Sequence, residues 1–202
     1  MRWIEKDSEP RRLKKFRAAG GRYADFSLPK GKQELKESLL REQANACAYC
    51  TATITFDNMK IEHWQPQASY PNRELDYKNL LAVCPGIWYG AAHYDTAKAH
   101  RVIGLDPTNR AHVIRLTYEK GTGKVASPDP VHDREINEVL QLNTKGLRVR
   151  RLAVLNALRK QLDKAGQGRT ANYEKFLRKA LQRRTEFDSI ILYYLRKKRG
   201  VI

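Results

Sequence analysis

The chain of 202 residues carries 39 Lys and Arg against 22 Asp and Glu, which gives a formal net charge of +17. Hydrophobic residues make up 41% of the sequence, enough for a modest core, so wholesale disorder is excluded. No apolar run reaches the roughly 18–20 residues that cross a bilayer, and the first residues lack the apolar segment of a signal peptide. We therefore expect a cytoplasmic protein without membrane contact, whose basic charge favours nucleic acid as partner.

The first half of the chain predicts a polar arm, a helix and short strands. Residues 1–29 begin with a basic, proline-containing stretch, which favours an extended N-terminal arm outside the core. Apolar residues at helical spacing predict a helix within 31–46. β-Branched residues at 51–56 and a second run at 59–63 predict a hairpin, and the apolar run 80–84 predicts a further short strand.

The second half is expected to become helical. Residues 92–100 predict a short helix, and 113–118 predict a strand of a second hairpin that turns at the glycines of 121–123. Apolar periodicity then predicts helices from 136 onward, in a region strongly enriched in Lys and Arg. The sequence thus predicts an α+β fold with three parts: an arm at 1–29, a core at 30–128 and a basic helical region at 129–202.

The dipeptide Glu62-His63 is the first candidate for chemistry. A neutral imidazole can take a proton from water while a neighbouring carboxylate holds a divalent cation. Such a pair alone is more often a surface feature than a site. Its context strengthens it, because Asn79, Asp95 and Lys98 follow at positions where a strand and a helix are predicted.

Three cysteines form the second candidate site. Cys47-x2-Cys50 has the spacing of a turn that holds one Zn²⁺ between two thiolates, and Cys84 follows the next apolar strand. Structural zinc would supply folding free energy to a small core. The alternative is three free or buried thiols without a metal.

These motifs together resemble an HNH (ββα-metal) endonuclease core. The narrower resemblance, which extends roughly end to end, is to the PtuB family of HNH nucleases in Septu anti-phage systems and their retron-associated relatives. The resemblance to the HNH core is carried by the motifs Cys47-x2-Cys50, Ile61-Glu-His-Trp-x-Pro66, Tyr77-Lys-Asn-Leu-Leu-Ala-Val-Cys84 and His93-Tyr-Asp-x2-Lys98. The narrower resemblance is carried by the opening Met1-Arg-x-Ile4, the block Glu42-Gln-x3-Cys-Ala-Tyr-Cys50 and the basic helical tail.

The resemblance implies a role for each matching residue. His63 would be the general base, and Glu62 and Asp95 would hold a catalytic Mg²⁺ or Mn²⁺. Asn79 would fix the loop and the orientation of the histidine. Lys98 would neutralise phosphate charge, although a solvated helix lysine is an equally good interpretation.

The sequence departs from the family at the zinc site. Relatives usually carry a fourth cysteine directly before the last motif residue, where this chain has Tyr94. We expect the neighbouring His93 to complete a site with Cys47, Cys50 and Cys84. The alternatives are a water molecule, loss of the zinc, or one of the other histidines, His100, His112 and His132, each of which is more often an ordinary surface residue.

The resemblance also implies a substrate and a partner. We expect hydrolysis of phosphodiester bonds in nucleic acid, with DNA favoured and tRNA the second candidate, and an ABC-type ATPase of the PtuA kind as partner. The basic helices would bind the phosphate backbone. The alternative function is a catalytically inactive, zinc-supported module that binds nucleic acid. The expected substrate-binding residues, besides Lys98, are Arg148, Arg151, Arg183 and Arg184.

Overall fold

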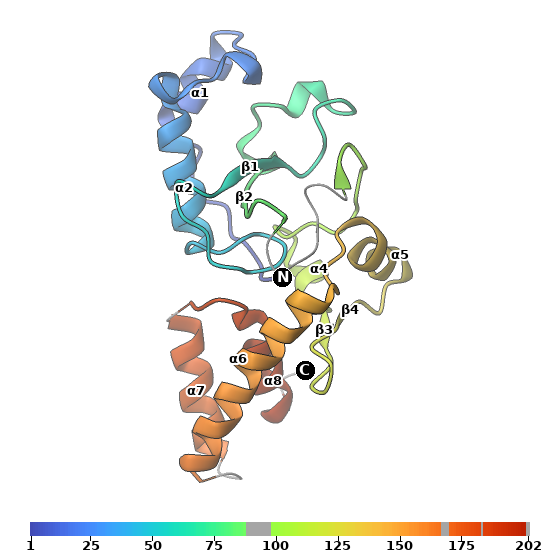
Figure 1. Cartoon of the computed structure of the whole chain (residues 1–202). Helices are drawn as coiled ribbons and strands as arrows, with labels where there is room; N and C mark the ends of the chain where they lie inside the picture. Colours follow the sequence, from blue (N-terminus) through green and yellow to red (C-terminus); the bar gives the residue numbers. More distant parts are fainter. Residues whose placement is uncertain (88–97, 167–169, 183, 201–202) are drawn as a thin grey trace.

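The computed structural model describes residues 1–87, 98–166, 170–182 and 184–200 and shows helices around two small antiparallel sheets (Figure 1). The expected α+β class is confirmed. In chain order the elements are α1 (Arg11–Ala18), η1 (Tyr23–Asp25), η2 (Leu28–Lys32), α2 (Gln33–Gln43), β1 (Lys60–His63), η3 (Pro71–Arg73), η4 (Tyr77–Asn79), β2 (Leu80–Val83), α4 (Arg110–Ile114), β3 (Thr117–Tyr118), β4 (Val125–Ala126), α5 (Pro130–Arg134), η6 (Glu135–Val139), α6 (Lys145–Lys164), α7 (Thr170–Gln182) and α8 (Asp188–Lys198).

The elements fall into two halves of the molecule. In Figure 1, α1, α2 and the β1–β2 hairpin lie in the upper half, whereas α6, α7 and α8 form the lower half.

None of the helices in the described part of the chain is long and apolar enough to span a bilayer.

The N-terminal segment is folded against the core, so the expectation of an extended arm is wrong. Met1, Ile4 and Leu13 are buried, and residues 11–18 form a helix. The amide of Ile4 donates to the carbonyl of Pro107 at 3.0 Å. A few spaced apolar residues are enough to bury one side of this segment while its basic side chains remain in water.

The first sheet pairs two segments that the sequence did not pair. The predicted strand at 59–63 is confirmed as β1, but its antiparallel partner is β2, with His63 opposite Leu80. The expected strand at 51–56 is absent from the described structure and contributes one isolated bridge, Ala46 to Thr53. The reason is local: after a left-handed residue at Thr51, the backbone of Ala52 and Ile54 bonds back to Cys47 and Asn45, at 2.8 Å each, and not to β1.

Helix α2, which confirms the helix expected within 31–46, closes the free edge of β2. The side-chain amide of Gln43 donates to the carbonyl of Ala82 at 2.7 Å and accepts from its N–H at 2.8 Å. Leu35 and Leu39 of α2 are fully buried in the core that includes β2. This packing holds the hairpin that carries Glu62 and His63 on a rigid base.

The C-terminal region is helical, as expected, and is docked onto the turn that follows Cys47. The amide of Phe187 donates to the carbonyl of Thr51 at 3.0 Å, and Asp188 at the start of α8 forms an ion pair with Arg2. The second hairpin is confirmed as β3 and β4, although residues 110–114 are helical. The part boundaries near 29 and 128 stay predictions, and the helix expected at 92–100 falls mostly on residues 88–97, outside the described residues.

Candidate active site and metal centre

His63 lies at the end of β1 and is held by a backbone carbonyl. Its Nε2 is 2.9 Å from the carbonyl oxygen of Glu74, and its ring meets the edge of the Tyr23 ring at a centroid distance of 4.5 Å. A carbonyl oxygen only accepts hydrogen bonds, so Nε2 carries the proton and donates. In the neutral ring the lone pair is therefore on Nδ1, which leaves that atom as the proton acceptor.

The surroundings of His63 favour the neutral ring. Burial lowers the pKa of His63 below its usual value, and the positive charge of Lys98 acts in the same direction. The hydrogen bond to the Glu74 carbonyl opposes this shift but does not cancel it. At pH 7 the imidazole is consequently in the form that can accept a proton.

Glu62 is paired with Lys98. The ammonium group of Lys98 donates to Oε1 of Glu62 at 2.5 Å and to the carbonyl of His63 at 2.9 Å. Lys98 is only 1% exposed, so it is not a solvated helix lysine. In this arrangement Lys98 neutralises the Glu62 carboxylate, and contact with a substrate phosphate would require it to leave that partner.

Asn79 connects the hairpin to the loop that covers His63. Its Oδ1 accepts from the amide of Gln65 at 2.7 Å, and its Nδ2 donates to the carbonyls of Gln65 at 3.0 Å and Arg73 at 3.1 Å. The side chain is fully buried. Because Arg73 directly precedes Glu74, these bonds also position the carbonyl that holds His63.

Replacing Asn79 by alanine should loosen this loop. Three backbone groups would lose their buried partner, and we expect the free energy of unfolding to fall by about 2–4 kcal/mol. Chemical denaturation measures the change, and hydrogen exchange of residues 65–74 localises it. The control is Asn72→Ala, since Asn72 is exposed on the same loop, and its effect should stay within about 0.5 kcal/mol. Equal stability of the two variants would contradict the positioning role of Asn79.

Cys47, Cys50 and Cys84 meet in one buried cluster. Their sulfur atoms all lie within 4.8 Å of one another, and Sγ of Cys50 is 3.7 Å from Sγ of Cys84. Backbone hydrogen bonds close the turn that carries Cys47 and Cys50. The amide of Cys47 donates to the carbonyl of Ala52 at 2.8 Å, and the amide of Ala52 donates to Sγ of Cys50 at 3.5 Å.

The cluster fits a metal such as zinc. Two thiolates on one tetrahedral Zn²⁺ lie about 3.8 Å apart when each Zn–S bond is about 2.3 Å. The Cys50–Cys84 distance of 3.7 Å matches this value and is far longer than a disulfide bond. Burial opposes ionisation of Cys47, but hydrogen bonds with the other two thiols hold its pKa well below the usual value. Three of the four ligands expected from the sequence are thus together, and the fourth, His93, lies outside the described residues.

The expected Mg²⁺ or Mn²⁺ site has only one of its two carboxylates in the described part of the chain. Glu62 is present beside His63, and Asp95 falls among residues 88–97. Among the described residues, the three cysteines are the only group of three or more potential metal ligands.

Arg151 does not lie on the surface where a substrate would be bound. It is 1% exposed, and its guanidinium donates to the carbonyls of Gly123 at 3.0 Å and Leu142 at 2.5 Å. This corrects the expectation from sequence: the side chain ties α6 to two neighbouring segments. Leu147 and Leu155, four residues away on either side, share its buried face.

Of the other three arginines expected to bind phosphate, two have backbone partners and one is not described. The guanidinium groups of Arg148 and Arg184 each donate to a backbone carbonyl, of Thr122 at 3.0 Å and of Glu42 at 3.2 Å. Arg183 lies outside the described residues. Contact of these arginines with nucleic acid stays a prediction.

Two residues at His63 were missed by the reading of the sequence. Tyr23 precedes His63 by 40 residues, and the Glu74 contact is made through the backbone, to which the residue type contributes nothing. No sequence signal marks either residue, because both contacts exist only once the chain has folded.

The fold and the cysteine cluster define a small protein of helices and short sheets with a centre that can bind a metal. No protein-family model matches the sequence. The chain is 36% identical over 90 residues to the Septu protein PtuB of Bacillus thuringiensis, and therefore resembles that protein. The aligned residues make up 44% of this chain and 35% of the relative, so the match spans about a third of the relative's length.

Proposed function

We propose that this protein is a metal-dependent endonuclease that hydrolyses phosphodiester bonds in nucleic acid. The observation that carries the proposal is the bond from Nε2 of His63 to the Glu74 carbonyl, which leaves Nδ1 as the atom that can accept a proton. The bond fixes the tautomer of His63, as required of a ring that accepts a proton at one defined atom. The resemblance to HNH endonucleases supports the same assignment.

The chain's own residues supply the base and its orientation. Nδ1 of His63 accepts the proton of the attacking water, and the Glu74 carbonyl keeps the ring in the required tautomer. Asn79 holds the loop that presents this carbonyl. Glu62 and Asp95 would hold a Mg²⁺ or Mn²⁺ ion, which would stabilise the charge that develops on the scissile phosphate and the leaving oxygen.

The cysteine cluster has a structural role in this proposal. Cys47, Cys50 and Cys84, with His93 as the fourth ligand, would hold a Zn²⁺ that braces the turn on which α8 is docked. The resemblance to a Septu protein further favours a role in anti-phage defence together with an ABC-type ATPase.

The experiment that tests the activity compares substrates directly. Purified protein, alone and with an ABC-type ATPase of the PtuA kind, is incubated with plasmid DNA and with total tRNA in Mg²⁺, Mn²⁺ or EDTA. We expect cleavage of one substrate class that requires the divalent cation, and loss of that cleavage in Glu62→Gln. Cleavage that persists in EDTA would contradict the proposal.

The ion pair between Lys98 and Glu62 favours a second candidate function. An ammonium group already occupies one oxygen of the carboxylate that would bind the metal, as expected if the site has lost catalysis and the protein only binds nucleic acid. Binding of DNA or tRNA without cleavage, under every cation and with the ATPase present, would support this binding module.

A further inference from the structure

We propose that a basic face formed by α1 and η2 holds the phosphodiester backbone of nucleic acid beside His63. We define this α1 basic face by the side chains of Arg11, Arg12, Lys14, Lys15, Lys30 and Lys32. The inference rests on the proposed nuclease function in naming the substrate. The sequence predicted the main nucleic-acid contact on the C-terminal helices. The α1 basic face lies in the other half of the molecule.

The charge of the α1 basic face is available for a ligand. Four of the eight residues of α1, at positions 11, 12, 14 and 15, are exposed and basic, and they lie on the side away from buried Leu13. Among the described residues, no carboxylate forms an ion pair with any of the six cations of this face. A group of exposed cations without ion-pair partners is the electrostatic pattern that a polyanion recognises.

The acidic groups near the α1 basic face compensate only part of its charge. Glu9 forms an ion pair with Arg17, and Glu74 forms one with Arg22. A carboxylate oxygen of Glu34 accepts from the backbone amide of Arg12 at 3.2 Å. Glu34 and Glu37 line the same surface hollow as Arg11 and Arg12 and offset part of their charge, whereas Glu9 and Glu74 are held by arginines outside the face.

A chain of ring contacts joins this face to His63. The ammonium of Lys30 lies 5.7 Å from the centre of the Phe16 ring, and that of Lys32 lies 4.8 Å from the centre of the Tyr23 ring. Tyr23 in turn meets His63 at 4.5 Å. A backbone bound along α1 and η2 would therefore pass the proposed general base.

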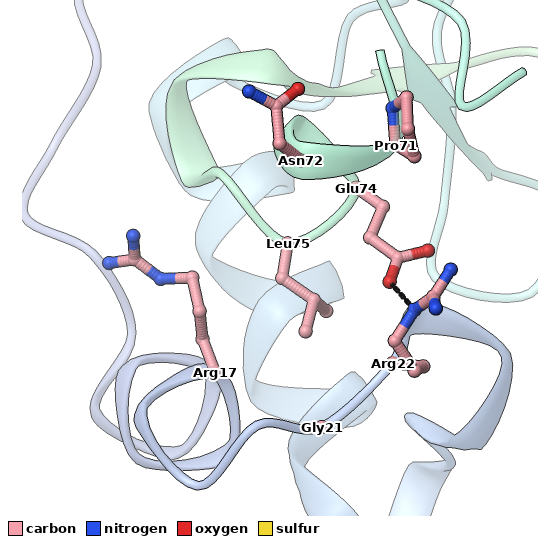
Figure 2. A pocket seen from close by; sticks show the side chains of 7 residues that line it. All are labelled: Arg17, Gly21, Arg22, Pro71, Asn72, Glu74 and Leu75. Atoms are coloured by element: carbon pink, nitrogen blue, oxygen red, sulfur yellow. Dashed lines mark hydrogen bonds and ion pairs between the residues drawn. The ribbon is translucent and has the colours of Figure 1, made fainter. Parts of the chain in front are cut away.

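A hollow of about 350 Å³ lies between the end of α1 and the loop that holds His63. Figure 2 shows Arg17 and Arg22 on one side, Asn72 and Glu74 on the other, and Leu75 between them. Its volume is at the lower end of the range for ligand-binding clefts. Because the carbonyl of Glu74 is the one that binds His63, the hollow adjoins the proposed site.

The test measures binding separately from cleavage. Full-length protein in EDTA is titrated into a fluorescent 20-base-pair DNA duplex and, in a second arm, into labelled tRNA, with anisotropy as readout. The test variant is Arg11→Gln/Arg12→Gln/Lys14→Gln/Lys15→Gln. The matched control removes four exposed charges from α6 and α7, in Lys164→Gln/Lys175→Gln/Arg178→Gln/Lys179→Gln. A double variant, Lys14→Gln/Lys15→Gln, guards against misfolding of the fourfold variant, and circular dichroism checks all three.

We expect the α1 variant to bind at least about tenfold more weakly in moderate salt, and the control to stay within about threefold. The slope of log affinity against log salt should fall by about 0.9 for each phosphate contact that is lost, and the double variant should show about half of the change. A control that loses as much affinity as the α1 variant would overturn the inference. Displacement of the DNA by polyglutamate at equal charge concentration would also overturn it, because it would indicate an acidic protein partner. Weak binding by the α1 variant together with no cleavage by the wild type would leave this surface in place while the nuclease proposal failed.

Discussion

Replacing His63 by alanine is expected to lower the cleavage rate by about 10²–10⁴-fold, the usual contribution of a positioned general base. The imidazole is half-buried, its Nε2 is used by the Glu74 carbonyl, and only Nδ1 remains to accept a proton. No other histidine of the described residues contacts this loop. Single-turnover cleavage with enzyme in excess measures the chemical step without interference from product release.

The variant His63→Gln removes the proton acceptor but keeps a hydrogen-bond donor for the Glu74 carbonyl. The glutamine amide can donate to the Glu74 carbonyl but cannot accept a proton at pH 7, so this variant should fold well and remain inactive. His100→Ala is the control, since His100 is exposed, and its rate should match the wild type. Activity in His63→Gln close to that of the wild type would rule out His63 as the base.

Replacing Cys50 by serine should remove the metal and destabilise the whole fold. The cluster is buried, and the turn that it braces carries Thr51, to which the start of α8 is bonded. Since a structural zinc site contributes folding free energy directly, we expect a loss of about 3 kcal/mol or more, a large part of the stability of a small domain. Thermal unfolding and elemental analysis of the purified protein measure the two effects.

The control for the cluster is Thr53→Ser, an exposed position of the same turn. It should retain about one zinc per chain and the wild-type melting temperature. Treatment of the wild type with a strong chelator should reproduce the destabilisation seen in Cys50→Ser. A wild-type protein that contains no zinc, and that is as stable after chelation as before, would show that the three thiols are only packed together.

Local features of the fold were predictable from the sequence. The strand at 60–63, the helix at 33–43 and the C-terminal helices follow from periodicity over a few residues. The close approach of Cys47 and Cys50 likewise follows from their spacing. The pairing of β1 with β2 did not follow, because a nearer β-branched segment offered a partner, and in the fold residues 52–54 pair with 45–47 instead.

Burial of single charged residues was the main source of error. The sequence left Lys98 open between a phosphate contact and a solvated helix lysine, and did not indicate its partner Glu62, which lies 36 residues away. Arg151 did carry a signal, since it falls four residues from Leu147 and Leu155 and therefore on the apolar side of α6. In the N-terminal segment, Leu13 among basic residues gave the same kind of signal: one buried side chain determines which face of a short helix is turned inward.

The measurement that tests the central proposal most directly is single-turnover cleavage of one defined nucleic acid by wild type and His63→Gln, each in Mg²⁺ and in EDTA. The proposed mechanism predicts product only for the wild type in Mg²⁺. The same product from His63→Gln in Mg²⁺, at a rate close to that of the wild type, would contradict it.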